Sequence, residues 1–307
     1  MNMPQSLDPA IPNQPVLDKK IKNAMAVLLG LLVGDIMGAT TEFTPIVSPK
    51  ELDQSLADLR AQKPHFQCVN QSVNGWVDAG DHTDDSSMML CCIRAYMFCY
   101  EKQIPFNYNI LMQCFIEWET QGKESGLKHA IGLGGTIRIS LNRWKAERYT
   151  PETILTLPED RVHKLTEEAF QNVPLRDGNG TIMRLAPFPV VAAATNHLEG
   201  AVDTAYKQSL VTTSGLLAAA CASLLAYLVC DTLLQTELSP EARKERLLSQ
   251  AIFNAFRTMM QGRGLRLEPD VEMLLDSNGT GDKAYLNWRV PLKDYCLYQQ
   301  NLEHQAG

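Results

Sequence analysis

Two short segments place hydroxyl and carboxylate groups beside small residues, and such groups could bind a hard cation. Residues 34–43 read Gly-Asp-Ile-Met-Gly-Ala-Thr-Thr-Glu-Phe, and residues 80–86 read Gly-Asp-His-Thr-Asp-Asp-Ser. In the second segment, Thr83 is followed directly by Asp84 and Asp85. Mg²⁺ and similar ions take oxygen ligands in near-octahedral geometry, which a Thr hydroxyl and two carboxylates can supply. The two segments therefore predict metal-assisted hydrolysis before any fold is considered.

The same polar residues also have simpler explanations. Asp84 and Asp85 precede an expected helix, so they could cap it and complement its dipole. Glu42 could lie in a solvated loop. Other residues in and beside the second segment fit a solvated loop better than additional metal ligands: Asp78, Asp81 and His82.

Two glycine-rich segments in the middle of the chain could bind phosphate. Residues 134–136 read Gly-Gly-Thr, and residues 178–187 read Gly-Asn-Gly-Thr-Ile-Met-Arg-Leu-Ala-Pro. Glycine lets the backbone approach a ligand closely and turn its N–H groups toward phosphate oxygens. Because Asn-Gly is also a common turn signal, an ordinary turn is the alternative interpretation of the second segment.

The elements that must position these residues are predicted to be helices. Apolar residues recur every three or four positions from Ile21 through Met25, Leu28 and Leu32 to Ile36, which predicts a helix over about 17–39. Similar patterns predict further helices over about 86–101, 108–120, 127–145, 200–208, 215–235 and 240–262. The alternation typical of strands is almost absent, so the predicted fold class is all-α.

The expected organisation is one helical domain over residues 17–307, preceded by a flexible lead-in over residues 1–16. Residues 215–230 are apolar on all sides, which indicates a central helix surrounded by others. The chain contains no internal repeat, low-complexity tract or clear linker. Periodicity is lost from about residue 263, and the polar residues 276–282 are typical of a loop.

Composition indicates a globular protein and argues against nucleic-acid binding and membrane insertion. The 307 residues are 45% hydrophobic and 21% charged, as in globular proteins with a sizeable core. The net charge is −7 and no basic run is interleaved with aromatic residues, so we expect no nucleic-acid partner. Residues 1–20 lack the pattern of a signal peptide. The apolar run at 24–34 is too short for a bilayer and is followed by Asp35, so we expect a buried helix and no membrane insertion.

The cysteines indicate a reducing compartment, with the cytoplasm as the first expectation. There are eight, none forms a C-x-x-C pair, and most lie in apolar stretches, as is typical of reduced thiols in a core. They occur at positions 68, 91, 92, 99, 114, 221, 230 and 296.

Four segments in this order resemble the ADP-ribosylglycohydrolase family, in particular its dinitrogenase-reductase-activating type. They are residues 34–43, with the pattern Gly-Asp-x-x-Gly-x-x-x-Glu-Phe; residues 83–86, Thr-Asp-Asp-Ser; residues 134–136, followed by Arg138 and Arg143; and residues 178–187. The resemblance covers about residues 20–235. It implies an all-α hydrolase that cleaves the glycosidic bond between ADP-ribose and a modified side chain, usually with two Mg²⁺ ions.

The resemblance also implies roles for the matching residues. Thr83, Asp84 and Asp85 would form half of the metal site, Glu42 would face the metals and the scissile ribose, and Glu42, Asp84 and Asp85 would be catalytic. A metal would polarise the ribose hydroxyls and a water molecule, and Glu42 would take the proton. The substrate would be an ADP-ribosylated protein. The residues implied to bind ADP-ribose are Gly134, Gly135, Gly178, Asn179, Gly180, Thr181 and Met183.

The sequence departs from the family at three functional positions. The late Gly-Asp-x-Asp-Thr-Thr motif that closes the metal site is absent, although Asp276, Thr280 and Asp282 lie in that half of the chain. Thr213 stands where the family has the His of a Thr-His pair. Gly135 stands where arginine-specific members carry an acidic residue. These differences predict one Mg²⁺ ion rather than two, or a reaction that does not need the metal.

Three functions remain open at this point. The first is hydrolysis that removes ADP-ribose from a protein side chain, most simply arginine. The second is a protein that binds ADP-ribose or an ADP-ribosylated partner without cleaving it. The third is a hydrolase of another nucleotide or ADP-ribosyl conjugate, because function resides in the site rather than in the fold.

Overall fold

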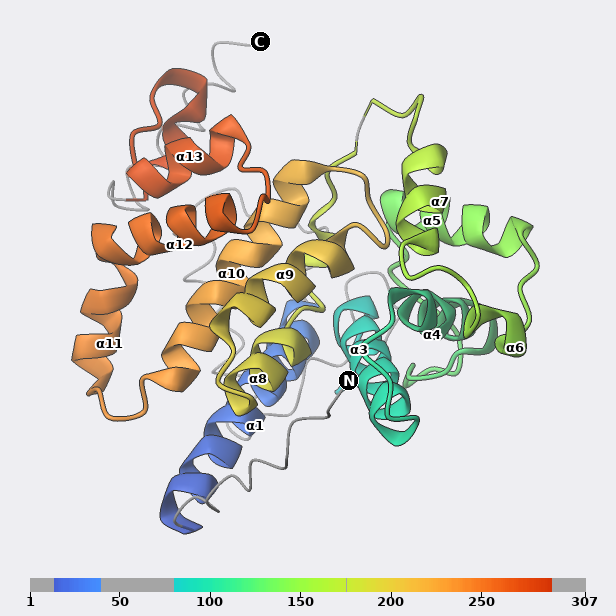
Figure 1. The fold of residues 1–307 in the computed structure, drawn as a ribbon, viewed down its shortest axis with the longest axis horizontal. Helices are drawn as coiled ribbons and strands as arrows, with labels where there is room; N and C mark the ends of the chain where they lie inside the picture. Colours follow the sequence, from blue (N-terminus) through green and yellow to red (C-terminus); the bar gives the residue numbers. More distant parts are fainter. Residues whose placement is uncertain (1–13, 40–79, 175, 289–307) are drawn as a thin grey trace, which may run out of the picture.

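The computed structural model describes residues 14–39, 80–174 and 176–288, and the regular elements in these ranges are all helical (Figure 1). No strand occurs among them, which confirms the all-α prediction for the described part of the chain. The short 3-10 helices are η1 (Asn179–Thr181) and η2 (Gly281–Leu286). The α-helices are α1 (Gln14–Gly38), α3 (Asp84–Glu101), α4 (Tyr108–Gln121), α5 (Gly135–Ala146), α6 (Pro151–Ile154), α7 (Arg161–Ala169), α8 (Pro187–Ala194), α9 (Leu198–Ser209), α10 (Leu216–Leu234), α11 (Pro240–Leu247), α12 (Gln250–Gly262) and α13 (Pro269–Asp276).

In the described part of the chain, the core consists of two apolar clusters, and α10 contributes to both. The first lies between α3, α4, α5, α7 and α8 and is built around large buried side chains such as Phe115 and Trp118. The second lies between α10, α12 and α13, around Phe256 and Met260. Helix α10 contributes alanines to both clusters, and its small side chains let α8 and α9 pack closely against it. The prediction of a central helix at this position is confirmed.

The described cysteines lie where the sequence predicted them. Those on α3 and α4, together with Cys230, are buried, and Cys221 is partly buried. Burial raises the pKa of Cys92, Cys114 and Cys230 to about 12, so these thiols stay protonated and unreactive at neutral pH. Two further cysteines, Cys68 and Cys296, lie outside the described residues.

Helix α1 differs from the prediction of a buried helix. It packs on α3, α8 and α10 along one side only. Met25, Leu29 and Val33 on the other side are 48%, 48% and 50% exposed. Because residues 24–34 of this helix are apolar on all sides, the spacing of the apolar residues identified the packed side only in part. Within the predicted stripe, Leu28 and Leu32 are partly buried on the packed side, whereas Ile21 and Met25 are exposed.

Two helices in the described ranges are long and apolar enough to cross a membrane by length and composition. They are Asp18–Gly38 within α1, of 21 residues, and α10. The window in α10 is 61% buried inside the protein, as its position in the core requires, whereas the window in α1 is 6% buried.

Two predicted helices have different boundaries in the structure. The helix expected from residue 127 begins only at Gly135, because Lys128 and Gly132 adopt positive φ angles that interrupt a right-handed helix. The helix expected over 240–262 is divided into α11 and α12. Ser249 starts α12 by accepting a hydrogen bond from the backbone N–H of Ile252. Four helices were not predicted: α6, α7, α8 and α13.

Candidate active site

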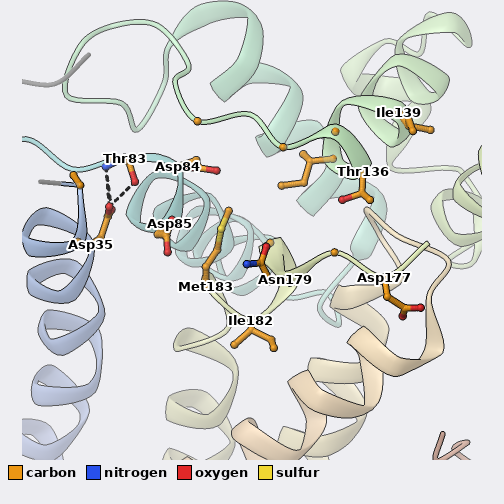
Figure 2. A pocket seen from close by; sticks show the side chains of 18 of the residues that line it. Asp35, Thr83, Asp84, Asp85, Thr136, Ile139, Asp177, Asn179, Ile182 and Met183 are labelled. Carbon is orange, nitrogen blue, oxygen red and sulfur yellow. Dashed lines mark hydrogen bonds between the residues drawn. The ribbon is translucent and has the colours of Figure 1, made fainter. Parts of the chain in front are cut away.

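A cavity of about 1030 Å³ lies where the end of α1, the start of α3, the start of α5 and the segment around η1 meet (Figure 2). Its lining residues come from positions 34–39, 83–85, 132–139 and 173–183. The fold therefore brings all four sequence segments to one place. Glu42, from the first segment, lies outside the described residues.

The first wall of the cavity is organised by Asp35, which lies in the last turn of α1 and is 9% exposed. Its Oδ2 accepts hydrogen bonds from the backbone N–H groups of Thr83, at 3.0 Å, and Ser86, at 3.0 Å. Its Oδ1 accepts a hydrogen bond of 2.5 Å from the hydroxyl of Thr83. The start of α3 is thus attached to the end of α1 (Figure 2).

Asp84 and Asp85 occupy the first turn of α3 and both line the cavity. Asp84 is buried, with 6% of its surface exposed, whereas Asp85 is partly exposed. Negative charge in the first turn of a helix is stabilised by the helix dipole. Thr83, and neither aspartate, is the N-cap residue of α3. The dipole part of the simpler interpretation therefore holds alongside the functional one, because the same helix end faces the cavity.

The loop between α4 and α5 covers Asp84. Gly132 has a φ of +72°, and a β-carbon built on it would lie only 2.1 Å from Asp84 Oδ1. Arg94 on α3 contacts this loop near its start, because its Nε lies 3.0 Å from Glu124 Oε1. Its Nη2 also donates to the carbonyl of Cys114 on α4, at 3.0 Å. The backbone carbonyl of Glu124 also contacts the ring of His82, at 3.0 Å from Nε2.

The opposite wall is the start of α5. Its N-cap is Gly134, which has no side chain that could cap the helix. Gly134, Gly135 and Thr136 all line the cavity. The N–H groups at the start of a helix have no partner within that helix, and with the helix dipole they favour an anion. A β-carbon on Gly135 would have no atom within 4 Å, so this part of the wall is open.

The segment around η1 lies close against α5. A β-carbon on Gly178 would lie 2.5 Å from Thr136 Oγ1, and one on Gly180 would lie 2.8 Å from Ile137 Cδ1. Gly178 and Gly180 are therefore needed for close packing, which the turn interpretation alone does not require. Asn179 and Met183 extend into the space between α3 and α5 (Figure 2).

Arg184 fixes the η1 segment from behind and is completely buried. Its Nε donates to Gln208 Oε1 at 2.9 Å, its Nη2 donates to Thr212 Oγ1 at 2.7 Å, and its guanidinium lies 4.6 Å from the ring centre of Phe115. Burial lowers the pKa of Arg184 to about 10. Gln208 also donates to the carbonyl of Thr181, at 2.8 Å.

Asp177, directly before Gly178, joins the η1 segment to the start of α10. Its Oδ1 accepts a hydrogen bond of 2.8 Å from the backbone N–H of Ala218, in the first turn of α10. A β-carbon on Gly215 would lie 2.0 Å from this oxygen, so the N-cap of α10 has room only for glycine. Asp177 and Asp35 thus do the same thing at two helices: each caps a helix from outside it.

Three residues that belong to the family-like motifs of the sequence do not line the cavity. Thr181 is buried and is not among the lining residues, in contrast to the other predicted ADP-ribose contacts. Arg143 pairs with Glu147 and Glu168. Thr213 is buried, and its hydroxyl accepts a hydrogen bond from the backbone N–H of Gly215 at 3.2 Å.

The late acidic residues do not complete the site in the described part of the chain. Asp276, at the end of α13, pairs with Arg257 on α12 at 2.7 Å. Neither Asp276 nor Thr280 is among the residues that line the cavity. The side chain of Asp282 lies outside the described part.

The described residues offer only part of a shell for a metal ion. Thr83, Asp84 and Asp85 supply one hydroxyl and two carboxylates from consecutive positions. No group of three or more His, Cys, Asp or Glu side chains that could hold a metal ion occurs among the residues described. The predicted Mg²⁺ site is therefore not assembled from these residues alone.

Four residues important for the site were not assigned roles from the sequence: Asp35, Thr136, Asp177 and Arg184. Asp35 and Arg184 stood inside motifs that were noted, but no local pattern shows a partner 48 or 28 residues away. Thr136 directly follows Gly134 and Gly135, so its position was a usable signal. Asp177 precedes Gly178 in the same way.

Known proteins similar to this chain share one family. The profile described as ADP-ribosylglycohydrolase matches residues 17–289. ADP-ribosylarginine hydrolase Tri1 from Pseudomonas putida (strain GB-1) is 27% identical over 179 residues, which cover 55% of this chain and 36% of that protein. ADP-ribosylarginine hydrolase Tri1 from Serratia proteamaculans (strain 568) is 29% identical over 147 residues, which cover 47% of this chain and 32% of that protein. The chain thus spans about a third of the length of these curated relatives.

A solved structure gives the same fold. It is described as an ADP-ribosylglycohydrolase-related protein complex and superposes with a TM-score of 0.51 at 20% sequence identity. The match covers 85% of this chain and 68% of the other.

Proposed function

We propose that this chain, which belongs to the ADP-ribosylglycohydrolase family, releases ADP-ribose from a modified protein side chain, with arginine as the first candidate. The observation that supports this most directly is the cavity. It places the carboxylates of Asp84 and Asp85 on one side and the glycine-lined start of α5 with the η1 segment on the other.

The chemistry of the two walls suits the two parts of ADP-ribose. The diphosphate carries negative charge and acceptor oxygens, which match the N–H groups at Gly135 and Thr136 at the start of α5. The ribose carries hydroxyl donors, which match the carboxylates at the start of α3. A volume of about 1030 Å³ is large enough for a ligand of this size.

Arginine is the finer part of the proposal. The two bacterial relatives are named ADP-ribosylarginine hydrolases, and the chain spans about a third of their length at 27% and 29% identity. Gly135 leaves open space where arginine-specific members carry an acidic residue, so orientation of the guanidinium must come from other groups. A protein with ADP-ribosylated arginine is therefore the first substrate to test, followed by other ADP-ribosyl conjugates.

The reaction requires water to replace the leaving side chain at the anomeric carbon of the proximal ribose. The C–N bond to arginine breaks and a C–O bond to water forms. The proton that the water loses passes to a carboxylate and from there to the leaving nitrogen, so the carboxylate is regenerated. Asp85, partly exposed at the cavity, can hold the water, and buried Asp84 can stabilise the positive charge that develops on the ribose ring. Glu42 remains the predicted proton acceptor.

Metal dependence is a separate part of the proposal. Members of this family are commonly metal-dependent. When bound, Mg²⁺ would act as a Lewis acid toward ribose hydroxyls, and Thr83, Asp84 and Asp85 are the described residues that could contribute to holding it.

A second function is favoured by one specific observation. Asp276, one of the two late aspartates that stand in the half of the chain where the missing motif would lie, is paired with Arg257 outside the cavity. This favours a protein that binds ADP-ribose without cleaving it.

The test is release of ADP-ribose from arginine-ADP-ribosylated protein, with added Mg²⁺ and with EDTA. Asp84→Asn and Asp85→Asn are compared with Asp276→Asn as the matched control outside the cavity. Release by the wild type and the control, but not by the two site variants, supports hydrolysis. Undetectable release together with binding of free ADP-ribose supports the binding protein instead. Release of ADP-ribose from a conjugate other than arginine retains the hydrolase and changes the substrate.

A further inference from the structure

The structure assigns Asp35 the role of a positioning residue for the candidate active site, an inference that rests on the proposed function. Its carboxylate joins the last turn of α1 to the first turn of α3 through four contacts, two with the N–H of Thr83, one with the N–H of Ser86 and one with the hydroxyl of Thr83. These residues directly flank Asp84 and Asp85. The orientation of both carboxylates therefore depends on Asp35.

The start of α3 is capped in an unusual way. Thr83 is the N-cap residue, and a Thr in this position commonly accepts a hydrogen bond from the N–H three residues later. Here Thr83 makes no such bond, and Asp35 accepts from that N–H, on Ser86, at 3.0 Å. The side chain of Thr83 is thereby released from capping its own helix.

The contact also fixes the direction of the Thr83 hydroxyl proton. An ionised carboxylate can only accept hydrogen bonds, so the proton of Thr83 Oγ1 points toward Asp35 Oδ1. The lone pairs of the same oxygen remain available on the cavity side. Thr83 can then accept a hydrogen bond from a ligand hydroxyl, but it cannot donate one to a phosphate oxygen. At the start of α3, Thr83 can therefore contact a ligand only through a hydrogen-bond donor or a cation.

The position of Asp35 in its own helix supports this role. The last turn of a helix carries the negative end of the dipole, so an acidic residue there does not stabilise α1. At the start of α3 the same charge is favourable. Asp35 is also 9% exposed, and the burial of a carboxylate is costly unless hydrogen bonds satisfy it, as the four contacts to α3 do.

The first experiment measures the positioning directly and needs no substrate. Amide hydrogen exchange is recorded for the wild type, for Asp35→Asn and for Asp231→Asn. Asp231 is a suitable control because it is a buried carboxylate paired with Arg246 at 2.7 Å and is not part of the cavity. Exchange at Thr83 and Ser86 should accelerate at least tenfold in Asp35→Asn and stay unchanged in Asp231→Asn. Unchanged exchange in Asp35→Asn would overturn the inference.

The second experiment asks whether Asp35 acts through Thr83, which a general effect on the fold would not mimic. Asp35→Asn and Thr83→Val are each expected to lower kcat/KM at least tenfold. In the double variant, Asp35→Asn should add less than a further twofold loss, because the hydroxyl that it orients is already absent. If the loss of kcat/KM in the double variant equals the product of the two single losses, Asp35 acts independently of Thr83 and the inference is overturned.

Failure of the proposed function can be separated from failure of this inference. If the wild type releases no ADP-ribose from any conjugate, the two single variants and the double variant are compared by their affinity for free ADP-ribose. The hydrogen-exchange experiment needs no substrate and is performed in the same way. If Asp35→Asn does not fold, Thr83→Ser and Thr83→Val replace it. Activity retained with Ser and lost with Val supports the role of an oriented hydroxyl, whereas equal effects of the two variants contradict it.

Discussion

Gly132 and Asp84 are so close that the α4–α5 loop and the start of α3 fit together only without a side chain on Gly132. Its φ of +72° and the 2.1 Å that would separate a β-carbon at this position from Asp84 Oδ1 both require glycine. We expect Gly132→Ala to lower the free energy of unfolding by about 2 kcal/mol or more. Gly135→Ala is the matched control, since its β-carbon meets no atom within 4 Å. Chemical denaturation of both variants measures the difference, and equal stability would contradict the described position of Asp84.

Gly178 and Thr136 provide a test by compensation. Gly178→Ala should weaken ADP-ribose binding, because its β-carbon would lie 2.5 Å from Thr136 Oγ1 and push the η1 segment away from α5. Adding Thr136→Ala removes that oxygen, so the double variant should bind ADP-ribose more tightly than Gly178→Ala alone. Isothermal titration with ADP-ribose is the measurement. A double variant weaker than both single variants would show that the two segments do not meet in this way.

The open side of α1 leads to a prediction about stability. Leu29 is 48% exposed, whereas Leu111 on α4 is fully buried. Leu111→Ala should therefore cost about 2–5 kcal/mol of unfolding free energy, and Leu29→Ala about 1 kcal/mol or less. Thermal and urea denaturation can compare the two. A cost for Leu29→Ala as large as that for Leu111→Ala would mean that this side of the helix is covered in solution.

His163 should make stability depend on pH. Its Nε2 lies 3.0 Å from the carbonyl of Lys207, and burial lowers its pKa below the usual value near 6.5. The unfolded chain then takes up a proton at a higher pH than the folded one. Stability should fall as the pH drops below about 6.5, by at most about 1.4 kcal/mol per pH unit from this group. The carbonyl of Lys207 and the carboxylates of Glu159 and Asp160 oppose the shift.

The measurement is urea denaturation between about pH 5 and 7.5 for the wild type and His163→Gln, with exposed His129→Gln as the control. His163→Gln should flatten the dependence in this interval, and His129→Gln should leave it unchanged. A wild-type slope that persists in His163→Gln would assign it to another group.

The predictions from sequence succeeded where a pattern is local. Long apolar runs gave the central helix α10, and short glycine and acidic motifs gave the four segments that meet at the cavity. Failures had physical causes of two kinds. Residues 24–34 of α1 are apolar on every side, so the pattern identified only part of the packed face. The positive φ of Lys128 is not encoded in its residue type.

Pairings between distant residues could not be predicted from a single sequence. The carboxylate of Asp35 reaches Thr83 across 48 positions, and Thr136 meets Gly178 where the start of α5 packs against the η1 segment. Each contact depends on how the helices are arranged, and nothing in the local composition indicates the partner. Thr181 shows the converse: it belongs to a well-defined motif, yet its side chain lies in the core rather than in the cavity.

The buried guanidinium of Arg184 has a consequence for the thermodynamics of ligand binding. Its hydrogen bonds to Gln208 and Thr212 and its contact with the ring of Phe115 hold the end of the η1 segment before any ligand arrives. Ordering a loop on binding costs conformational entropy, and that cost is avoided where the loop is already fixed by the core. Association at this wall should therefore resemble the docking of rigid bodies, with little of the enthalpy released being offset by ordering of the chain.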